Sequence, residues 1–258
     1  FAFSATNAPQ VTVTSLMAGS YTFRLTVTDN AGGQATDDVV INVLDTTTTT
    51  PPPTTGGALV VKTVDKKSAQ GRTTHTVTVA AGDLIVITTA AETDTRNATI
   101  TSNRGILFTK RGDASAYHSG DAEIYTATAN FSGSITITSN WGTWWQGSVV
   151  YVISGQEATP AGARVIKTNQ ASAQGSLITT KANSLLICVS SDWSSQDGAG
   201  RVYRDAVTER AYQYLDPKTG TFYHYSIAAP VIKAYTEGLR TPVSTNGFST
   251  IVYEIRPK

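Results

Sequence analysis

The feature that most constrains this chain is a repeat, because residues 58–258 carry one pattern twice. Lys62-Thr63 recurs as Lys167-Thr168, and Ser68-Ala69-Gln70-Gly71 recurs as Ser172-Ala173-Gln174-Gly175. The matching segments keep their order and a spacing of 101 to 105 residues along the whole stretch. A duplication predicts two structural halves, 58–157 and 158–258, which form either two tandem sandwiches or one domain with a common core. The join between them is short and lacks linker composition, so we expect one domain.

The repeated region has the pattern of β-strands throughout. Short β-branched runs such as Thr76–Val79, Leu84–Ile87 and Ile135–Ile137 are separated by Gly, Asn, Asp and Ser. Such spacing is typical of antiparallel all-β folds, and no segment keeps a helical period with caps. We therefore predict an all-β chain in which 58–258 forms a duplicated antiparallel β-sandwich or jelly roll.

The N-terminal segment predicts a β-hairpin. Residues 21–27 alternate apolar and polar, which places Tyr21, Phe23, Leu25 and Val27 on one face that we expect to be buried. Asp29–Gly33 has turn composition, and Val39, Ile41 and Val43 form the returning strand. Two strands do not hold together alone in water, so we expect this chain to be a piece of a longer protein.

Residues 10–45 carry a more specific pattern. It reads Leu16-x-x-Gly19-x-Tyr21-x-Phe23-x-Leu25-Thr26-Val27-Thr28-Asp29-Asn30-x-Gly32, followed by Asp38-Val39-x-Ile41-x-Val43. This run resembles the C-terminal half of a PKD-type, immunoglobulin-like repeat. The resemblance implies a partial PKD-like domain at 1–45, of the kind that serves as a spacer in secreted and cell-surface multidomain proteins.

A linker follows at 46–57. Five threonines, three prolines, two threonines and two glycines give this stretch nothing to bury, and the triple proline favours an extended spacer.

The region 58–258 also resembles an uncharacterised β-sandwich domain of bacterial secreted and phage-related proteins. The segments that carry this resemblance are Ala81–Val86, Thr179–Leu186, Thr208–Arg210 and Tyr253–Pro257. It implies an appended sandwich module and no catalytic motif.

Composition excludes several classes of function. With 15% charged residues and a net charge of +1, the chain lacks the basic surface that a protein uses to bind nucleic acid, so we expect no nucleic-acid partner. No apolar run is long enough for membrane insertion by a helix. The single cysteine, Cys188, and three scattered histidines offer no multi-cysteine or histidine metal site, so we expect no metal ligands and no required cofactor.

The most unusual segment holds three of the four tryptophans. Trp141, Trp144 and Trp145 precede the last strand of the first half, and the second half has no tryptophan there. Indole faces can lie against sugar rings, so we predict a polysaccharide or cell-surface glycan ligand. The predicted ligand-binding residues are Trp141, Trp144, Trp145, Gln146, Asp192 and Trp193. The alternative is that these indoles pack inside the sandwich.

Acidic residues raise two further alternatives. Loops with Glu92, Asp94 and Asn97 in one half and Asp192 and Asp197 in the other leave a structural calcium ion open, although solvated turns explain them as well.

Catalysis has weaker signals. Asp121 and Glu123 share one strand face, and we expect both to be surface charge rather than a glycosidase pair. Tyr223-His224-Tyr225 predicts a strand with both tyrosines on one face and His224 on the other. We predict no catalytic residues.

The sequence therefore predicts a non-catalytic, carbohydrate-binding extracellular or cell-surface module of a larger protein. A structural or adhesive segment of a surface filament or phage fibre is the first alternative. A polysaccharide-degrading enzyme on a jelly-roll scaffold is the second.

Overall fold

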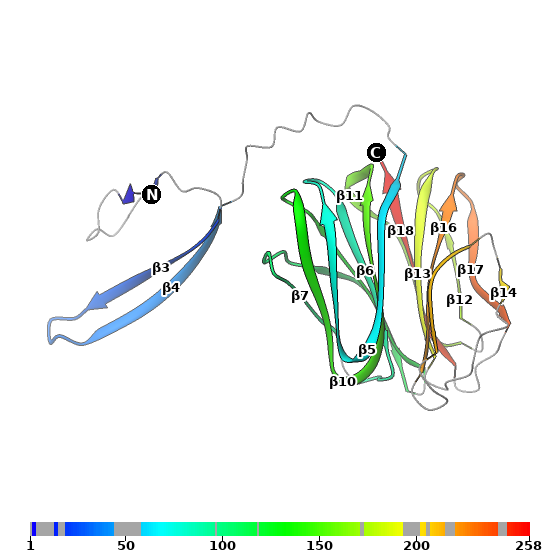
Figure 1. Ribbon diagram of the computed structural model, residues 1–258, viewed down its shortest axis with the longest axis horizontal. Helices are drawn as coiled ribbons and strands as arrows, with labels where there is room; N and C mark the ends of the chain where they lie inside the picture. The colour runs from blue at the N-terminus through cyan, green and yellow to red at the C-terminus, as the bar shows by residue number, and fades with distance from the viewer. Residues whose placement is uncertain are drawn as a thin grey trace. The chain divides into compact units, whose positions relative to one another are not determined.

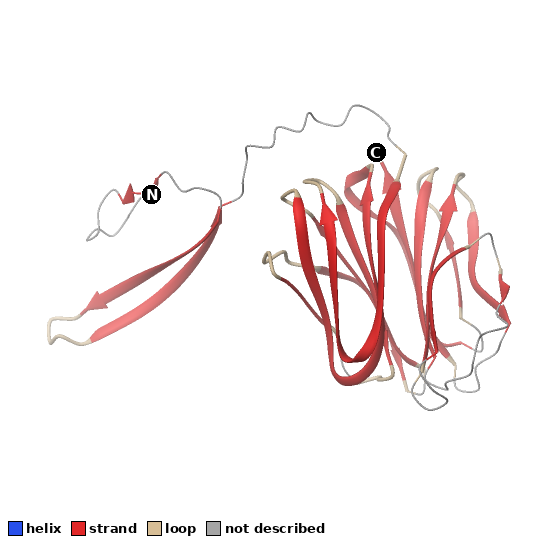
Figure 2. Ribbon diagram, viewed as in Figure 1, coloured by secondary structure: helices blue, strands red, loops and turns tan. Residues whose placement is uncertain are grey.

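The computed structural model contains strands and no helix in its described part, which confirms the predicted all-β class (Figure 2). The described residues are 2–3, 13–14, 19–43, 58–95, 97–117, 119–170, 173–192, 202–204, 207–214, 220–241 and 247–258. Over these residues no helix has the length and apolarity to cross a membrane. The predicted linker at 46–57 lies outside them. The chain divides into two compact units, Phe1–Pro52 and Pro53–Lys258.

The first unit contains two antiparallel strand pairs. β1 (Ala2–Phe3) pairs with β2 (Val13–Thr14), and β3 (Gly19–Thr28) pairs with β4 (Gln34–Val43). The β3–β4 turn depends on Asp29, whose Oδ1 accepts hydrogen bonds from the backbone N–H groups of Ala31 (2.8 Å) and Gly33 (2.7 Å). Gly32 has a φ of 86°, a conformation that glycine adopts without steric cost.

One expectation about this unit is wrong. The face of β3 predicted to be buried is largely exposed, with Leu25 at 64% and Val27 at 56% exposure, whereas Tyr21 and Phe23 are half-buried. A hairpin has two open faces, and no described strand covers this one.

The second unit begins with the strands of the first half (Figure 1), and its described residues form a six-stranded sheet. Their order in the sheet is β5-β10-β6-β9-β8, and β7 pairs with β10 off that path. The strands are β5 (Val60–Val79), β6 (Leu84–Ala91), β7 (Thr99–Ser102), β8 (Thr109–Ala116), β9 (Gly120–Thr128) and β10 (Gly133–Ser154).

The second half repeats this arrangement. Its main sheet has the order β11-β18-β13-β16-β15, and a smaller sheet has the order β12-β17-β14. The strands are β11 (Gln156–Gln170), β12 (Gln174–Ile178), β13 (Ser184–Asp192), β14 (Val202–Tyr203), β15 (Thr208–Tyr214), β16 (Thr221–Ala229), β17 (Ala234–Thr241) and β18 (Phe248–Pro257).

A shared bulge shows how closely the halves correspond. β8 and β15 each skip one residue in their pairing with the next strand, at Arg111 and at Arg210. In both, the arginine Nε donates to a hydroxyl of that strand, Thr126 Oγ1 at 2.7 Å and Ser226 Oγ at 2.8 Å. Two independent folds would not place one irregularity at equivalent positions.

Each half has its own core between a main sheet and an outer layer. In the first half, β5 and β10 are long enough to take part in both layers. Their pairing breaks between Asn140 and Trp145, where β10 bends from one layer into the other. Their outer segments carry Val77, Val79 and Ile135, which pack with Ile85 and Ile87 of β6. In the second half the small sheet is the outer layer, and a core including Leu177, Leu186 and Tyr235 fills the space.

A third core joins the two halves. Alternate residues of β6, including Leu84 and Val86, pack with Leu185 and Ile187 of β13 and with Ile251 of β18. The main sheets meet in reverse order, so that β5 lies near β15, β6 near β13, and β8 near β11. This arrangement is that of a two-fold symmetric dimer within a single chain.

Gly120 tests this contact between the halves. Its φ is 73°, and an added Cβ would lie 2.7 Å from the Ala91 carbonyl oxygen and against the Ser191 hydroxyl. We expect Gly120→Ala to lower the free energy of unfolding by about 2–4 kcal/mol, from backbone strain plus overpacking.

Gly82→Ala is the matched control, because Gly82 also has a positive φ (89°) but has open space around it. Gly82→Ala should lower the free energy of unfolding by about 1 kcal/mol. Urea unfolding of both variants and wild type measures the two losses. Equal losses for the two variants would show that the halves are not packed as described.

Candidate functional site

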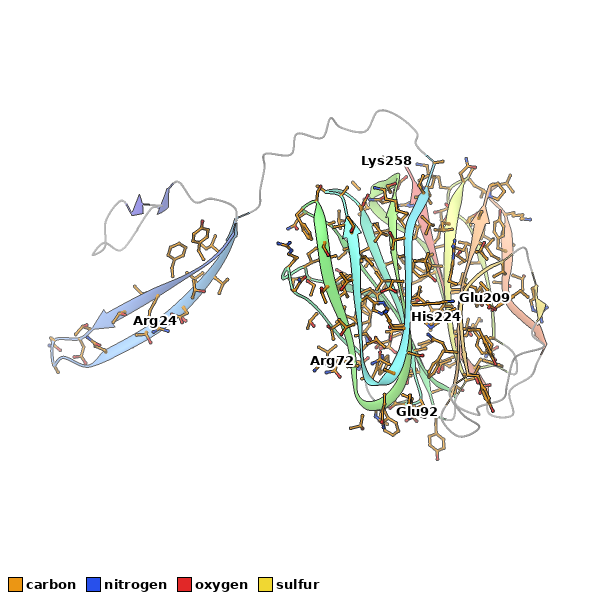
Figure 3. All side chains as sticks on the ribbon, viewed as in Figure 1. Arg24, Arg72, Glu92, Glu209, His224 and Lys258 are labelled. Carbon is orange, nitrogen blue, oxygen red and sulfur yellow. The ribbon has the colours of Figure 1, made fainter. Side chains whose placement is uncertain are left out.

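The candidate site lies at the end of unit 2 where β6 stops and β9 begins. Ala91, the last residue of β6, pairs with Asp121 on one side and Gln146 on the other. The halves meet here, since Ser191 Oγ donates to the Ala91 carbonyl (3.2 Å) and Ser249 Oγ donates to the Gly120 carbonyl (2.9 Å). Figure 3 labels Glu92 at this end and Lys258 at the opposite one.

Trp141 is an internal residue. Its side chain is 1% exposed, it belongs to the first-half core, and its indole Nε1 donates to Thr89 Oγ1 at 2.8 Å. Burial with a satisfied indole N–H is the structural role that tryptophan commonly takes. Trp141 therefore supports the bend of β10 from within.

The other two described indoles keep part of their surface in solvent. Trp144 is half-buried and packs against the same core, and Trp145 is half-buried outside it. The backbone N–H of Trp145 donates to Glu92 Oε1, and the backbone N–H of Glu92 donates to the Trp145 carbonyl, each at 3.2 Å. Burial raises the pKa of the Glu92 carboxyl. This double contact holds the bend against the loop after β6.

Gln146 is fully buried, and its amide is saturated by protein partners. Its Nε2 donates to the carbonyls of Gly71 (2.6 Å) and Ser139 (3.2 Å). Its Oε1 accepts from the hydroxyls of Ser139 (2.9 Å) and Thr73 (3.3 Å). Gln146 therefore positions the bend and offers no free group to a ligand.

The remaining predicted residues are less informative. Asp192 is buried at the end of β13, and Trp193 and Asp197 lie outside the described residues. The side chains of the first-half loop for which a structural calcium ion was left open make separate contacts. Glu92 holds Trp145, whereas Asn97 Oδ1 accepts from Lys110 Nζ at 2.5 Å.

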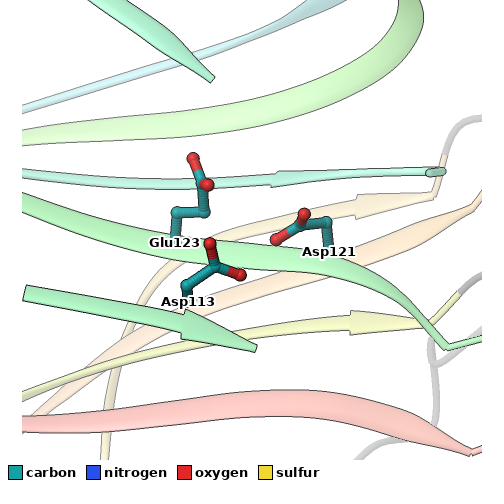
Figure 4. A group of neighbouring side chains, drawn as sticks. All are labelled: Asp113, Asp121 and Glu123. Carbon is teal, nitrogen blue, oxygen red and sulfur yellow. The ribbon is translucent and has the colours of Figure 1, made fainter. Parts of the chain in front are cut away.

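A different acidic group forms in the described part of the chain. Ligand atoms of Asp113, Asp121 and Glu123 lie within 4.8 Å of one another (Figure 4). Asp121 and Glu123 project from β9 on the side of the first-half core, and Asp113 is paired with Glu123 across β8–β9. The expectation that Asp121 and Glu123 are surface charge is wrong, since they are 2% and 0% exposed.

Burial changes the acid strength of this cluster. It raises the pKa of Asp121 to about 9, with the nearby carboxylates of Glu123 and Asp113 adding to the effect. One oxygen of Asp121, Oδ1, has no hydrogen-bond partner among the described residues. Burial also raises the pKa of Glu123, although Lys110 and Tyr125 oppose it.

A Ser–His–Asp arrangement occurs that spacing along the sequence did not reveal. His75 Nε2 lies 2.7 Å from Ser148 Oγ, and His75 Nδ1 lies 3.1 Å from Asp65 Oδ2. Ser148 and His75 are both fully buried, and Thr73 also bonds the Ser148 hydroxyl at 2.7 Å. A nucleophile must reach its substrate, so this network satisfies polar groups within the sheet.

The prediction for Tyr223-His224-Tyr225 is confirmed. Both tyrosines belong to the second-half core, and His224 points to the opposite side, where its Nδ1 lies 2.8 Å from Thr88 Oγ1. Burial lowers the pKa of His224 to about 3, so this histidine is neutral. Cys188 is buried as well.

Comparison with known proteins bears on the N-terminal unit alone. Residues 1–43 match the family model "K319L-like, PKD domain". The match supports a PKD-type domain and includes most of residues 10–45, which carried the resemblance. PKD domains are typically found in extracellular proteins. Searches of curated proteins and of solved structures found no match to the chain.

The buried acid cluster predicts a pH dependence of stability. Asp121 ionises near 3.8 when unfolded and near 9 when folded, so between these values the unfolded chain releases a proton that the folded chain keeps. Wild type should lose stability relative to Asp121→Asn across that window, by roughly 1.4 kcal/mol for each pH unit. Urea unfolding of both proteins from pH 4 to pH 9 measures the difference.

Asp94→Asn is the control, because it removes a partly exposed carboxylate on the neighbouring loop, outside the buried cluster. A constant difference between wild type and Asp121→Asn over the whole range would contradict the assigned pKa.

Proposed function

We propose that this chain is a non-catalytic extracellular module whose second unit binds a polysaccharide or cell-surface glycan at the bend of β10. The observation that carries the proposal is the difference in solvent exposure among the three indoles. Trp141 is anchored inside by Thr89, whereas Trp144 and Trp145 keep solvent-exposed surface next to it. An indole with one buried edge and one open face is a rigid, amphipathic platform.

The surroundings of the bend support a preformed surface. Gly142 and Thr143 are exposed, and Gly142 has a φ of 74° that glycine tolerates. Side-chain hydrogen bonds of Asn140, Glu92 and Gln146 fix the backbone around the bend. A surface held this way loses little conformational entropy on binding. The proposed contact residues are thus Trp144 and Trp145, with Trp141 and Gln146 as supports.

The extracellular setting rests on the PKD-type domain at residues 1–43. In this proposal the first unit is a spacer, and the second unit is the part that meets the ligand.

A structural role is the second candidate. The observation that favours it is that Trp141 is buried and Trp144 packs against the first-half core. If packing is the whole role of these residues, unit 2 is a rigid segment of an extracellular assembly.

Affinity gel electrophoresis separates the two candidates. We expect at least one polymer from a panel of plant, algal and bacterial polysaccharides to retard wild type. Trp144→Ala/Trp145→Ala should weaken that retardation about tenfold or more, because it removes both platforms.

Phe131→Ala is the matched control, since Phe131 is also a half-buried aromatic packed on the first-half core but lies before the start of β10, away from the bend. It should leave retardation unchanged. An absence of retardation across the panel, together with destabilised tryptophan variants, would favour the structural role.

A further inference from the structure

Lys110 of β8 has an unusual set of neighbours. Its Nζ donates to Asn97 Oδ1 at 2.5 Å, to Asp113 Oδ2 at 2.7 Å, and to Glu123 Oε1. It also lies 5.6 Å from the centroid of the Tyr125 ring. A primary amine, a carboxamide and a buried carboxyl group therefore meet at one point.

The carboxyl group of Glu123 is held rigidly. It is fully buried, and its Oε2 accepts hydrogen bonds from the Tyr125 hydroxyl (2.8 Å) and from the Ala98 N–H (3.0 Å). Ala98 follows Asn97 directly, so one carboxyl group both contacts the amine and anchors the backbone beside the amide. Oε1 is the atom left to exchange a proton with Lys110.

The second half provides an internal comparison. Strand register matches β8 and β9 of the first half to β15 and β16 of the second. The positions of Lys110, Asp113 and Glu123 are taken there by Glu209, Tyr212 and Tyr223, and that of Tyr125 by Tyr225. The ring centroids of Tyr212 and Tyr223 lie 5.4 Å apart with the planes tilted by 45°, so aromatic packing suffices to build this part of the fold. The charged set of the first half therefore has a role other than packing.

We propose that Lys110 and Asn97 become joined by an intramolecular isopeptide bond that the folded chain forms by itself, with Glu123 carrying the proton. Glu123 takes one proton from the Lys110 ammonium, and the free amine attacks Cγ of Asn97. As that nitrogen loses a second proton and Nδ2 gains one, the Cγ–Nδ2 bond breaks and ammonia leaves. One amide replaces another, so the reaction needs no oxidant, reductant or metal.

Several features of the site favour this step. The amine and the amide are already in contact, which replaces an encounter with a fixed orientation. Burial disfavours the charged pair and raises the pKa of Glu123, which makes it a proton acceptor. Burial also lowers the pKa of Lys110, but its hydrogen bonds to Asp113 and Glu123 outweigh that and raise it overall. The attacking form is thus the one in which Glu123 holds the proton.

Asn97 is the electrophile that this geometry selects. A carboxylate such as that of Asp113 resists attack by an amine, and Glu123 serves as the proton carrier, whereas an amide carbonyl that accepts a hydrogen bond is polarised towards it. The bond would tie the connection between β6 and β7 to β8. That connection includes Glu92, which holds Trp145, so the cross-link would also brace the bend.

The mass of the intact, denatured protein tests the proposal. Loss of one ammonia predicts a mass about 17 Da below that of the sequence. After trypsin digestion, peptide 97–104 should be recovered joined to peptide 105–111, because a modified Lys110 is not cleaved. Lys110→Arg, Asn97→Ala and Glu123→Gln should each restore the mass of their own sequences.

Asn103→Ala is the matched control, since the Asn103 Oδ1 accepts from the Thr136 N–H rather than from a lysine. It should keep the deficit. A wild-type mass equal to that of the sequence overturns the proposal, whether or not any variant folds. A deficit of about 18 Da that survives Asn97→Ala also overturns it, because water would then have been lost to a carboxyl group.

Discussion

Burial of both faces of the main sheets is the constraint on which unit 2 depends. A sheet in the middle of a stack must bury the side chains on both of its faces, and β6 and β13 are buried at every position. In each half, one set of alternate residues packs against the main sheet of the other half. The other set packs against the outer layer of its own half. The duplication supplies the partner surface within the chain, so the central core needs no second molecule.

The same constraint explains the polar networks at the end of unit 2. When one strand serves two layers, it must bend, and the bend of β10 brings backbone groups out of regular pairing between Asn140 and Trp145. Buried groups without partners cost about 1–3 kcal/mol each, and the Gln146 amide donates hydrogen bonds to the backbone carbonyls of Gly71 and Ser139. The hydrogen bonds among Ser148, His75 and Asp65 continue this network along the sheet. They have the geometry of a catalytic triad, but Ser148 and His75 are buried away from any substrate.

Local patterns predicted the parts of the fold that local patterns control. Alternation along Tyr223-His224-Tyr225 gave the correct faces, and runs such as Leu84–Ile87 gave strands. Alternation also placed Asp121 and Glu123 on a common face, but it does not reveal what covers that face. The cover consists of Ala98 and its neighbours, which approach only in the tertiary fold. The sequence left open whether Trp141 binds a ligand or packs inside for a similar reason, because a register break falls immediately after Asn140.

The comparison between the halves separates residues that build the fold from residues that do something further. Arg111 and Arg210 make equivalent bonds, so both belong to the common scaffold. Glu123 and Tyr223 occupy equivalent strand positions with opposite chemistry, and the tyrosine fills its core without burying a carboxyl group. A buried carboxyl group at such a position lowers stability unless an amine or a proton compensates it. Because packing does not require that cost, the Lys110–Glu123 pair is best understood through the reaction that an amine, an amide and a proton carrier can perform together.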